Sequence, residues 1–307
     1  MSRCLTVGLM QYEISENESE NLKKIKKNVD SMMLGMNKPE LIMGPELALG
    51  LEARLNDTLI GEFSDIARKY KIYFIPGSVY YDKKKGDETI TYNSVLIFGP
   101  DGELIDEYDK ICPYYPLEGY VTPGDKLVLF EIKEKNIKIG IMICHDWSFP
   151  EISRSLTLMG AELLLRPAVD PEGLYDSFRH VAPVRALENQ AYFISLNACG
   201  RSLGASYYGH SMIVSPESCI LYEADNVEVN ICMTLDFDLV ERTRKYGTFF
   251  TEQLLRQLKI FKFPRPFENM EDSPLIKNLP DPNIDVDSRL MHVSSAGLNT
   301  ELGKYPL

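Results

Sequence analysis

Short apolar runs that are typical of buried strands alternate with helical stretches through the first two-thirds of the chain. Residues 5–11 predict a strand, and residues 18–34 predict an amphipathic helix with apolar positions at a spacing of about 3.6 residues. Further strands are expected at residues 41–44, 72–76, 91–98, 103–108, 128–132, 138–143, 161–165, 191–197, 211–215, 220–223 and 229–236, and further helices at 59–70, from Pro150 onward and at 175–190. Helices and strands interleaved in this way predict sheets covered by helices, which is an α/β layered fold.

The size and charge of the chain limit its domain count and its partners. With 307 residues, 44% of them hydrophobic, it can bury one large domain or two smaller ones. The net charge of −12 argues against a nucleic-acid partner or an anionic membrane surface, and the basic runs at 23–27 and 83–85 are typical of a solvated helix face and a hairpin tip. No apolar stretch approaches the roughly 18 residues of a membrane span, and no signal-peptide pattern precedes the first strand. We therefore expect a soluble, cytoplasmic protein.

The cysteines and histidines are scattered along the chain. None of the six cysteines forms a Cys-x-x-Cys pair, which argues against a disulfide framework and a tetrahedral zinc site. None of the four histidines forms a ligand pair at helical spacing, and no glycine-rich loop that could cradle a phosphate follows a strand. The sequence therefore predicts no metal site and no cofactor.

The composition changes at about residue 262. Proline-containing stretches at 263–266, 279–282 and 305–306 interrupt regular structure there, so we divide the chain into a folded domain, residues 1–262, and an extended C-terminal arm, residues 263–307. The arm carries apolar side chains that a monomer would leave in water, namely Phe263, Phe267, Ile284, Val286, Leu290 and Met291. We expect the arm to lie across a neighbouring subunit of a homo-oligomer.

The strand-like run at 138–143 stops abruptly at Cys144, and Pro150 then opens a helical stretch. A thiol at a strand-to-helix turn is well placed to react, because strand ends present side chains and helix-end amides favour a thiolate. The alternative is a buried structural cysteine, since free cysteine is among the most buried residue types.

Three further reactive side chains follow strand-like runs. Glu46 follows the run at 41–44, Lys110 follows the run at 103–108, and Glu118 lies in the aromatic and proline-rich loop after Lys110. Taken singly, each is typical of an exposed charge or a helix cap. Taken together with Cys144, they supply a base for a thiol, a cation for an oxyanion and the nucleophile itself, which is the equipment for acyl transfer.

Several motifs resemble those of the nitrilase superfamily of carbon–nitrogen hydrolases. Glu46, Lys110 and Cys144 occur in that family's order, and the resemblance covers about residues 4–260. The supporting motifs are Cys144-His145-Asp146 with Phe149-Pro150-Glu151, Pro123-Gly124-Asp125, Arg185-Ala186-Leu187-Glu188-Asn189 with Asn197, and Tyr208-Gly209-His210-Ser211 with Pro216. The resemblance implies a four-layer α-β-β-α sandwich in a single catalytic domain, often paired into dimers and larger assemblies.

The loop at 110–120 resembles the aliphatic amidase and formamidase branch, which has lysine, proline, an aromatic residue, proline and glutamate in this order. The implied activity is hydrolysis of a small carboxamide to a carboxylate and ammonia through a Cys thioester. Departures from that branch at 47–48 and 147–148 leave the acyl group open. An N-carbamoyl-amide hydrolase or a nitrilase is the alternative within the superfamily, and a non-catalytic binding protein is the alternative outside enzymes.

The resemblance also implies a role for each site residue. Glu46 is the expected base, Cys144 the nucleophile, Lys110 with the His145 backbone N–H the oxyanion donors, and Glu118 the group that positions the amide. The two carboxylates beside one lysine should have pKa values that are pushed apart. Tyr114, Tyr115, Tyr120 and Trp147 are expected to wall a small, dry pocket, with core packing as the alternative for each aromatic ring.

Overall fold

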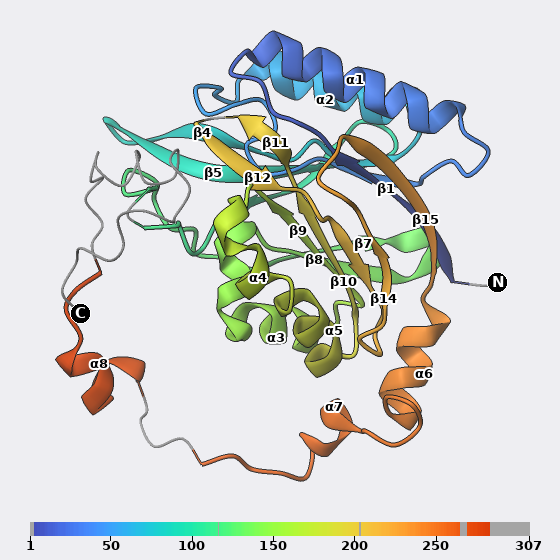
Figure 1. The fold of residues 1–307 in the computed structure, drawn as a ribbon, viewed down its shortest axis with the longest axis vertical. Helices are drawn as coiled ribbons and strands as arrows, with labels where there is room; N and C mark the ends of the chain where they lie inside the picture. The colour runs from blue at the N-terminus through green and yellow to red at the C-terminus, as the bar shows by residue number, and fades with distance from the viewer. Residues whose placement is uncertain (1–2, 116, 203, 265–268, 283–307) are drawn as a thin grey trace.

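Two mixed β-sheets lie face to face, and helices cover the outer face of each (Figure 1). The structure is a computed structural model that describes residues 3–115, 117–202, 204–264 and 269–282. The order of layers is helix, sheet, sheet, helix, so the predicted α/β fold with four layers is confirmed.

The first sheet has seven strands, in the order β15-β1-β2-β3-β5-β4, with β6 paired to β5. The strands are β1 (Cys4–Gln11), β2 (Leu41–Met43), β3 (Tyr73–Ile75), β4 (Ser78–Lys85), β5 (Glu88–Phe98), β6 (Leu104–Asp109) and β15 (Val229–Asp236). Helices α1 (Glu18–Leu34) and α2 (Asp57–Tyr70) cover its outer face (Figure 1). Apolar side chains of both helices, such as Ile25 and Phe63, join one buried cluster with Ile42 and Phe74 of the sheet.

The second sheet has six strands in the order β14-β13-β10-β9-β8-β7. The strands are β7 (Val128–Ile132), β8 (Ile137–Ile141), β9 (Leu163–Ala168), β10 (Tyr192–Asn197), β13 (Met212–Val214) and β14 (Ile220–Glu223). Helices α3 (Pro150–Leu158) and α5 (Val181–Asn189) cover its outer face, where Leu156 and Ala186 pack against Leu164 and Phe193. A separate two-stranded ladder joins β11 (Cys199–Ser202) and β12 (Ala205–Tyr208).

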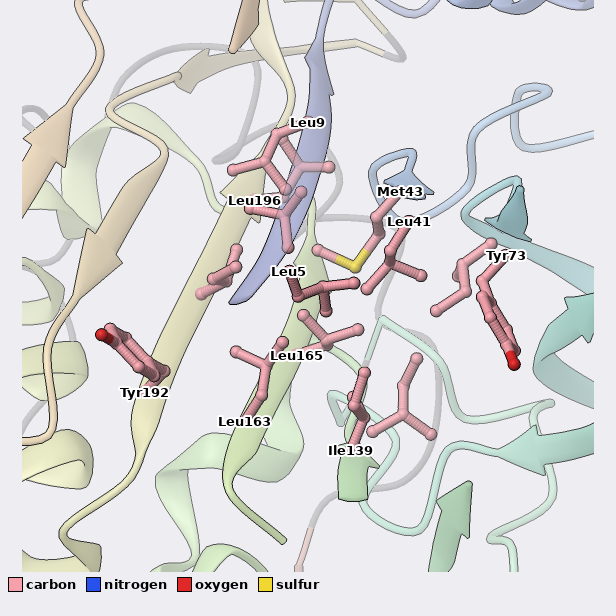
Figure 2. Packing of buried hydrophobic residues seen from close by; sticks show 14 of the residues in the cluster. Leu5, Leu9, Leu41, Met43, Tyr73, Ile139, Leu163, Leu165, Tyr192 and Leu196 are labelled. Carbon is pink, nitrogen blue, oxygen red and sulfur yellow. The ribbon is translucent and has the colours of Figure 1, made fainter. Parts of the chain in front are cut away.

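The largest core lies between the two sheets. Because side chains alternate along a strand, Leu5 and Leu9 of β1 point toward the second sheet, where Figure 2 shows Leu163, Leu165 and Leu196. The opposite face of β8 turns toward α3, and there the chain has Gly140. A Cβ atom at this position would lie 3.1 Å from Leu156 Cβ, so the glycine allows the helix to approach the sheet closely.

Most of the predicted elements are present, but the single helix predicted at 175–190 is wrong. The structure has α4 (Tyr175–Phe178), a break at Arg179 and His180, and then α5. Pro183 explains the break, because it has no N–H to donate to the Arg179 carbonyl and fits only the first turn of a new helix. Strand β4, the β11–β12 ladder and helix α6 (Asp238–Tyr246) were not predicted from the sequence.

Beyond α6 the chain runs through α7 (Leu254–Gln257) to a short helix, α8 (Pro274–Asn278), which lies apart from the two sheets in Figure 1. Of the apolar arm residues singled out above, Phe263 is described and is 69% exposed. The others, Phe267, Ile284, Val286, Leu290 and Met291, lie outside the described residues. Among the helices that the structure describes, none combines the length and apolarity needed to cross a bilayer.

Candidate active site

Strand ends from both sheets bring the predicted reactive side chains to one cavity. Glu46 follows β2 and Lys110 follows β6, both in the seven-stranded sheet, whereas Cys144 follows β8 of the six-stranded sheet. All three line a cavity of about 420 Å³, together with Glu118. The turn that carries Glu46 lies directly against the turn at Pro76, because Gly44 has no side chain to collide with the Pro76 carbonyl.

The cavity floor holds a buried ionic network. Lys110 Nζ donates hydrogen bonds to Glu46 Oε1 at 2.8 Å and to Glu118 Oε2 at 2.5 Å. Asn93 Nδ2 bridges the same two carboxylates at 2.9 and 3.0 Å. Glu46 and Lys110 are each 1% exposed, so their charges interact with little screening by water.

The two carboxylates titrate differently. Burial, together with the neighbouring charge of Glu118, raises the pKa of Glu46 above its ordinary value. Burial also opposes ionisation of Glu118, but Lys110 and the Tyr114 N–H, which donates to Glu118 at 2.7 Å, bring the pKa of Glu118 below its ordinary value. The predicted separation of the two pKa values is therefore confirmed in direction.

Cys144 occupies a strained turn. Its φ of 44° lies in the left-handed region, which a side chain other than glycine rarely adopts. The turn directs the Cys144 thiol into the cavity. The Cys144 carbonyl oxygen accepts a hydrogen bond from Arg166 Nε at 2.8 Å. Arg166 is itself fully buried and forms an ion pair with Asp170, with Nη1 2.7 Å from Oδ2. Asp170 Oδ1 lies 3.5 Å from Cys144 Sγ.

The thiolate expected at this turn is not favoured in the free site. Burial, followed by the charges of Glu46 and Asp170, raises the pKa of Cys144 well above its ordinary value. Lys110 and Arg166 act in the opposite direction but do not outweigh these effects. Desolvation and two neighbouring carboxylates therefore keep the resting thiol protonated, and a base is needed to activate it.

Asp146 fastens the turn of Cys144 to the loop of Lys110. Its carboxylate accepts hydrogen bonds from the Ile143 N–H at 2.8 Å, the Cys112 N–H at 2.7 Å and the Tyr108 hydroxyl at 2.6 Å. Burial raises the pKa of Asp146 to about 6. One carboxylate thus joins the end of β8 to the segment that follows β6.

Of the predicted substrate-binding residues, His145 and Tyr114 line the cavity. Their rings meet edge to face with centroids 5.1 Å apart, and Phe149 flanks His145 at 5.3 Å. Burial, followed by the charge of Lys110, lowers the pKa of His145, so this ring is neutral at pH 7. Tyr120 also lines the cavity, as expected, whereas Tyr115 is not among the described lining residues.

Trp147 does not line this cavity. Its ring packs in the core under α5 against Phe178 and Phe193, and the Arg166 guanidinium lies 3.3 Å from the ring centroid. Its backbone carbonyl accepts a hydrogen bond from Arg185, which also pairs with Glu188 at 3.0 Å. The structure therefore gives Trp147 the core packing that was the alternative in the sequence analysis.

Arg166, Asp170 and Asn93 were not predicted from the sequence as site residues. The predicted strand at 161–165 stopped one residue before Arg166, whereas β9 continues to Ala168. The available signal was Arg166 itself, a charged residue in an otherwise apolar strand. A buried arginine needs an acidic partner, so it indicates a nearby carboxylate. Within the described ranges, no group of three or more histidine, cysteine, aspartate or glutamate side chains is arranged to hold a metal ion.

Comparison with known proteins places the chain in a family. The carbon-nitrogen hydrolase family profile matches residues 6–245. A nitrilase of Pyrococcus abyssi is 34% identical over 59% of this chain and 65% of its own length. A 2-oxoglutaramate amidase of Paenarthrobacter nicotinovorans is 26% identical over 76% of this chain and 84% of its own length. The crystal structure of Saccharomyces cerevisiae Nit3, a member of branch 10 of the nitrilase superfamily, superposes with a TM-score of 0.72 at 27% identity, covering 79% of this chain and 93% of Nit3. The chain therefore belongs to the carbon–nitrogen hydrolase family of the nitrilase superfamily, whose members hydrolyse non-peptide carbon–nitrogen bonds.

Proposed function

We propose that the protein hydrolyses a primary carboxamide to a carboxylate and ammonia through a thioester on Cys144. The observation that carries this proposal is the buried floor of the cavity, where a base, a cation and a thiol lie together. Glu46, with its raised pKa, is a stronger base than an ordinary carboxylate and lines the same cavity as the Cys144 thiol. Asp170 is a weaker base than Glu46, because Arg166 brings the pKa of Asp170 below its ordinary value. We therefore assign Asp170 a structural role as the partner of Arg166.

In the first step, Glu46 accepts the thiol proton while Cys144 Sγ attacks the amide carbon. Lys110 has three N–H donors, and two of them hold Glu46 and Glu118, so the third can hold the oxyanion together with the His145 N–H. Each such donor is worth on the order of 3 kcal/mol in the transition state. Glu46 then gives its proton to the departing ammonia and next takes one from the water that cleaves the thioester.

The acceptors on the cavity floor favour an amide over a nitrile. An amide NH₂ presents two donors, which the carboxylates of Glu46 and Glu118 can accept, whereas a nitrile carbon–nitrogen bond presents none. The loop at 110–120 supports an assignment to the amidase and formamidase side of the superfamily. A carbamoyl-amide hydrolase is the second candidate, because a carbamoyl group presents the same NH₂ donors.

Product analysis tests the proposed function. The purified protein is given primary amides, N-carbamoyl compounds and the matching nitriles, and the carboxylate, ammonia and carbon dioxide formed are measured. We expect equal amounts of ammonia and carboxylate from amides and little turnover of nitriles. Turnover of nitriles that exceeds turnover of the matching amides would contradict the proposal.

We further propose that residues 263–307 form an arm that binds a second copy of the chain. Phe263, at the start of this region, is 69% exposed in the single chain. Leu275 and Leu279, in and after α8, are 67% and 54% exposed. Burial against a neighbouring subunit would remove these surfaces from water.

Deletion of residues 263–307 is expected to lower the size of the oligomer or its thermal midpoint, because it removes that apolar surface. Sedimentation velocity and thermal melts of the full chain and the truncated chain measure both. Ammonia release per folded chain serves as the control, because the proposed catalytic residues all lie before residue 263. Identical sedimentation and melting would show that the arm is an appendage without a structural role.

A further inference from the structure

The cavity above the ionic floor is larger and more apolar than a two-carbon amide requires. Its volume of about 420 Å³ falls in the range of roughly 300–1,000 Å³ that is typical of sites for ligands much larger than acetamide. The walls are built mainly from apolar and aromatic side chains, namely Leu47, Leu51, Tyr80, Leu117, Val169, Leu174, Phe178, Ala205 and Tyr207. The cavity is therefore larger than the small pocket that was predicted from the sequence.

The exposure of the lining side chains shows which end of the cavity is buried and which end opens to solvent. Glu46, Lys110 and Cys144 at its floor are between 1% and 9% exposed. Leu51 and Tyr120, which also line it, are 37% and 50% exposed and therefore lie at its rim. A carboxamide held at the floor would thus extend its acyl group along the apolar walls toward the rim.

The charges around the cavity disfavour an anionic acyl group. Among the described lining residues there are four carboxylates (Glu46, Glu52, Glu118 and Asp170) and two cations, Lys110 and Arg54. Arg166, just outside the lining, pairs with Asp170, so three carboxylates remain beside the two cations. Lys110 is held by Glu46 and Glu118 on the floor. Arg54 stacks over Tyr80 at 5.0 Å, lies 3.7 Å from Asp82 and donates to the Leu51 and Ala53 carbonyl oxygens. A substrate carboxylate would therefore enter a cavity in which carboxylates outnumber cations and in which both cations already have acidic neighbours.

From the size, walls and charge of this cavity, we infer that the substrates are primary amides with a neutral, apolar acyl group of about five or more carbons, linear or phenyl-bearing. This inference rests on the proposed function and goes further by assigning the acyl group. It also separates this chain from the 2-oxoglutaramate amidase among its relatives, whose named substrate carries a carboxylate.

Two substrate series test the inference. In the first, kcat/KM is measured for acetamide, butanamide and hexanamide, and we expect a rise of about fourfold per methylene, the equivalent of ~0.8 kcal/mol for each buried CH₂. In the second, succinamic acid is compared with 4-methylpentanamide, which has the same number of heavy atoms and an isopropyl group in place of the carboxylate. We expect the neutral amide to be preferred by about 100-fold or more, because the carboxylate would enter the cavity without a partner.

Two variants locate the effect in the cavity. Leu174→Asn, which places an isosteric amide on the apolar wall, is expected to lower the ratio of the hexanamide to the acetamide kcat/KM by about tenfold. Leu34→Asn is the matched control, because Leu34 is 86% exposed at the end of α1, and it should leave both values unchanged. Arg54→Gln examines the competing possibility that the rim arginine binds an anionic acyl group.

The outcomes are distinguishable from a failure of the proposed function. If no amide releases ammonia, the proposed function itself is wrong. If amides are hydrolysed but kcat/KM is flat or falls with chain length, the assigned acyl group is wrong. Preference for succinamic acid, lost selectively in Arg54→Gln, would also overturn the inference and would assign Arg54 to an anionic acyl group instead.

Discussion

Replacing Cys144 by serine is expected to leave a folded protein whose kcat for ammonia release is lower by on the order of 10³-fold or more. A hydroxyl has a higher pKa than a thiol, and Glu46 is a carboxylate whose pKa, although raised, is far too low to deprotonate it. Ammonia release under saturating amide measures the loss, and circular dichroism establishes that the variant is folded. Turnover near the wild-type rate would show that Cys144 is not the nucleophile.

Three of the five other thiols supply the matched controls. Burial raises the pKa of both Cys112 and Cys199 to about 12, and Cys219 is exposed on the surface. None of these three lines the cavity formed by the described residues. Cys112→Ala, Cys199→Ala and Cys219→Ala should therefore retain turnover, with some loss of stability at the buried Cys199 and the half-buried Cys112. A folded variant of this set without activity would mean that the nucleophile is a different thiol.

Replacing Arg166 by methionine is expected to lower the free energy of unfolding by about 3–5 kcal/mol, because the Asp170 carboxylate is then left buried without its counter-ion. The variant also loses the hydrogen bond to the Cys144 carbonyl oxygen, so the strained turn loses a support and kcat should fall as well. Urea unfolding monitored by tryptophan fluorescence measures the stability, since Trp147 packs directly on Arg166.

A double variant separates the lost pair from simple loss of packing. Arg166→Met combined with Asp170→Leu removes both charges and should be more stable than Arg166→Met alone. Lys26→Met is the control for an exposed pair, because Lys26 and Glu62 are 2.6 Å apart at the surface, and it should change the unfolding free energy by no more than about 1 kcal/mol. If Arg166→Met costs no more than this control, the buried pair is not a major source of stability.

Helices and strands could be predicted from the sequence where the local spacing of apolar residues determines their boundaries. The strands at 128–132, 220–223 and 229–236 and the helix at 18–34 begin and end where apolar periodicity places them. Prediction failed at 175–190, where the helical pattern was continuous but one proline dictated a break. It also failed for β4, whose polar outer half reads as hairpin tip rather than strand.

The individual residues of the site could be predicted from the sequence, but the tertiary contacts around them could not. Glu46, Lys110, Glu118 and Cys144 each stand at or beyond a strand end, so their convergence on one cavity follows from the layered fold. The protonation state of Cys144 could not be predicted, because it depends on the Asp170 and Glu46 charges that tertiary packing brings to the thiol. The core position of Trp147 was likewise decided by packing across α5.

The division of the site between two sheets has a consequence for the newly made chain. Glu46 and Lys110 belong to the part that is synthesised first, whereas Cys144 and Arg166 come later and in the other sheet. Neither part alone contains both Glu46 and Cys144, and the Asp146 hydrogen bonds that join the two parts run from one to the other. The proposed base and the proposed nucleophile therefore meet only when the two sheets dock, so a chain whose sheets have not docked lacks the arrangement on which the proposed activity depends.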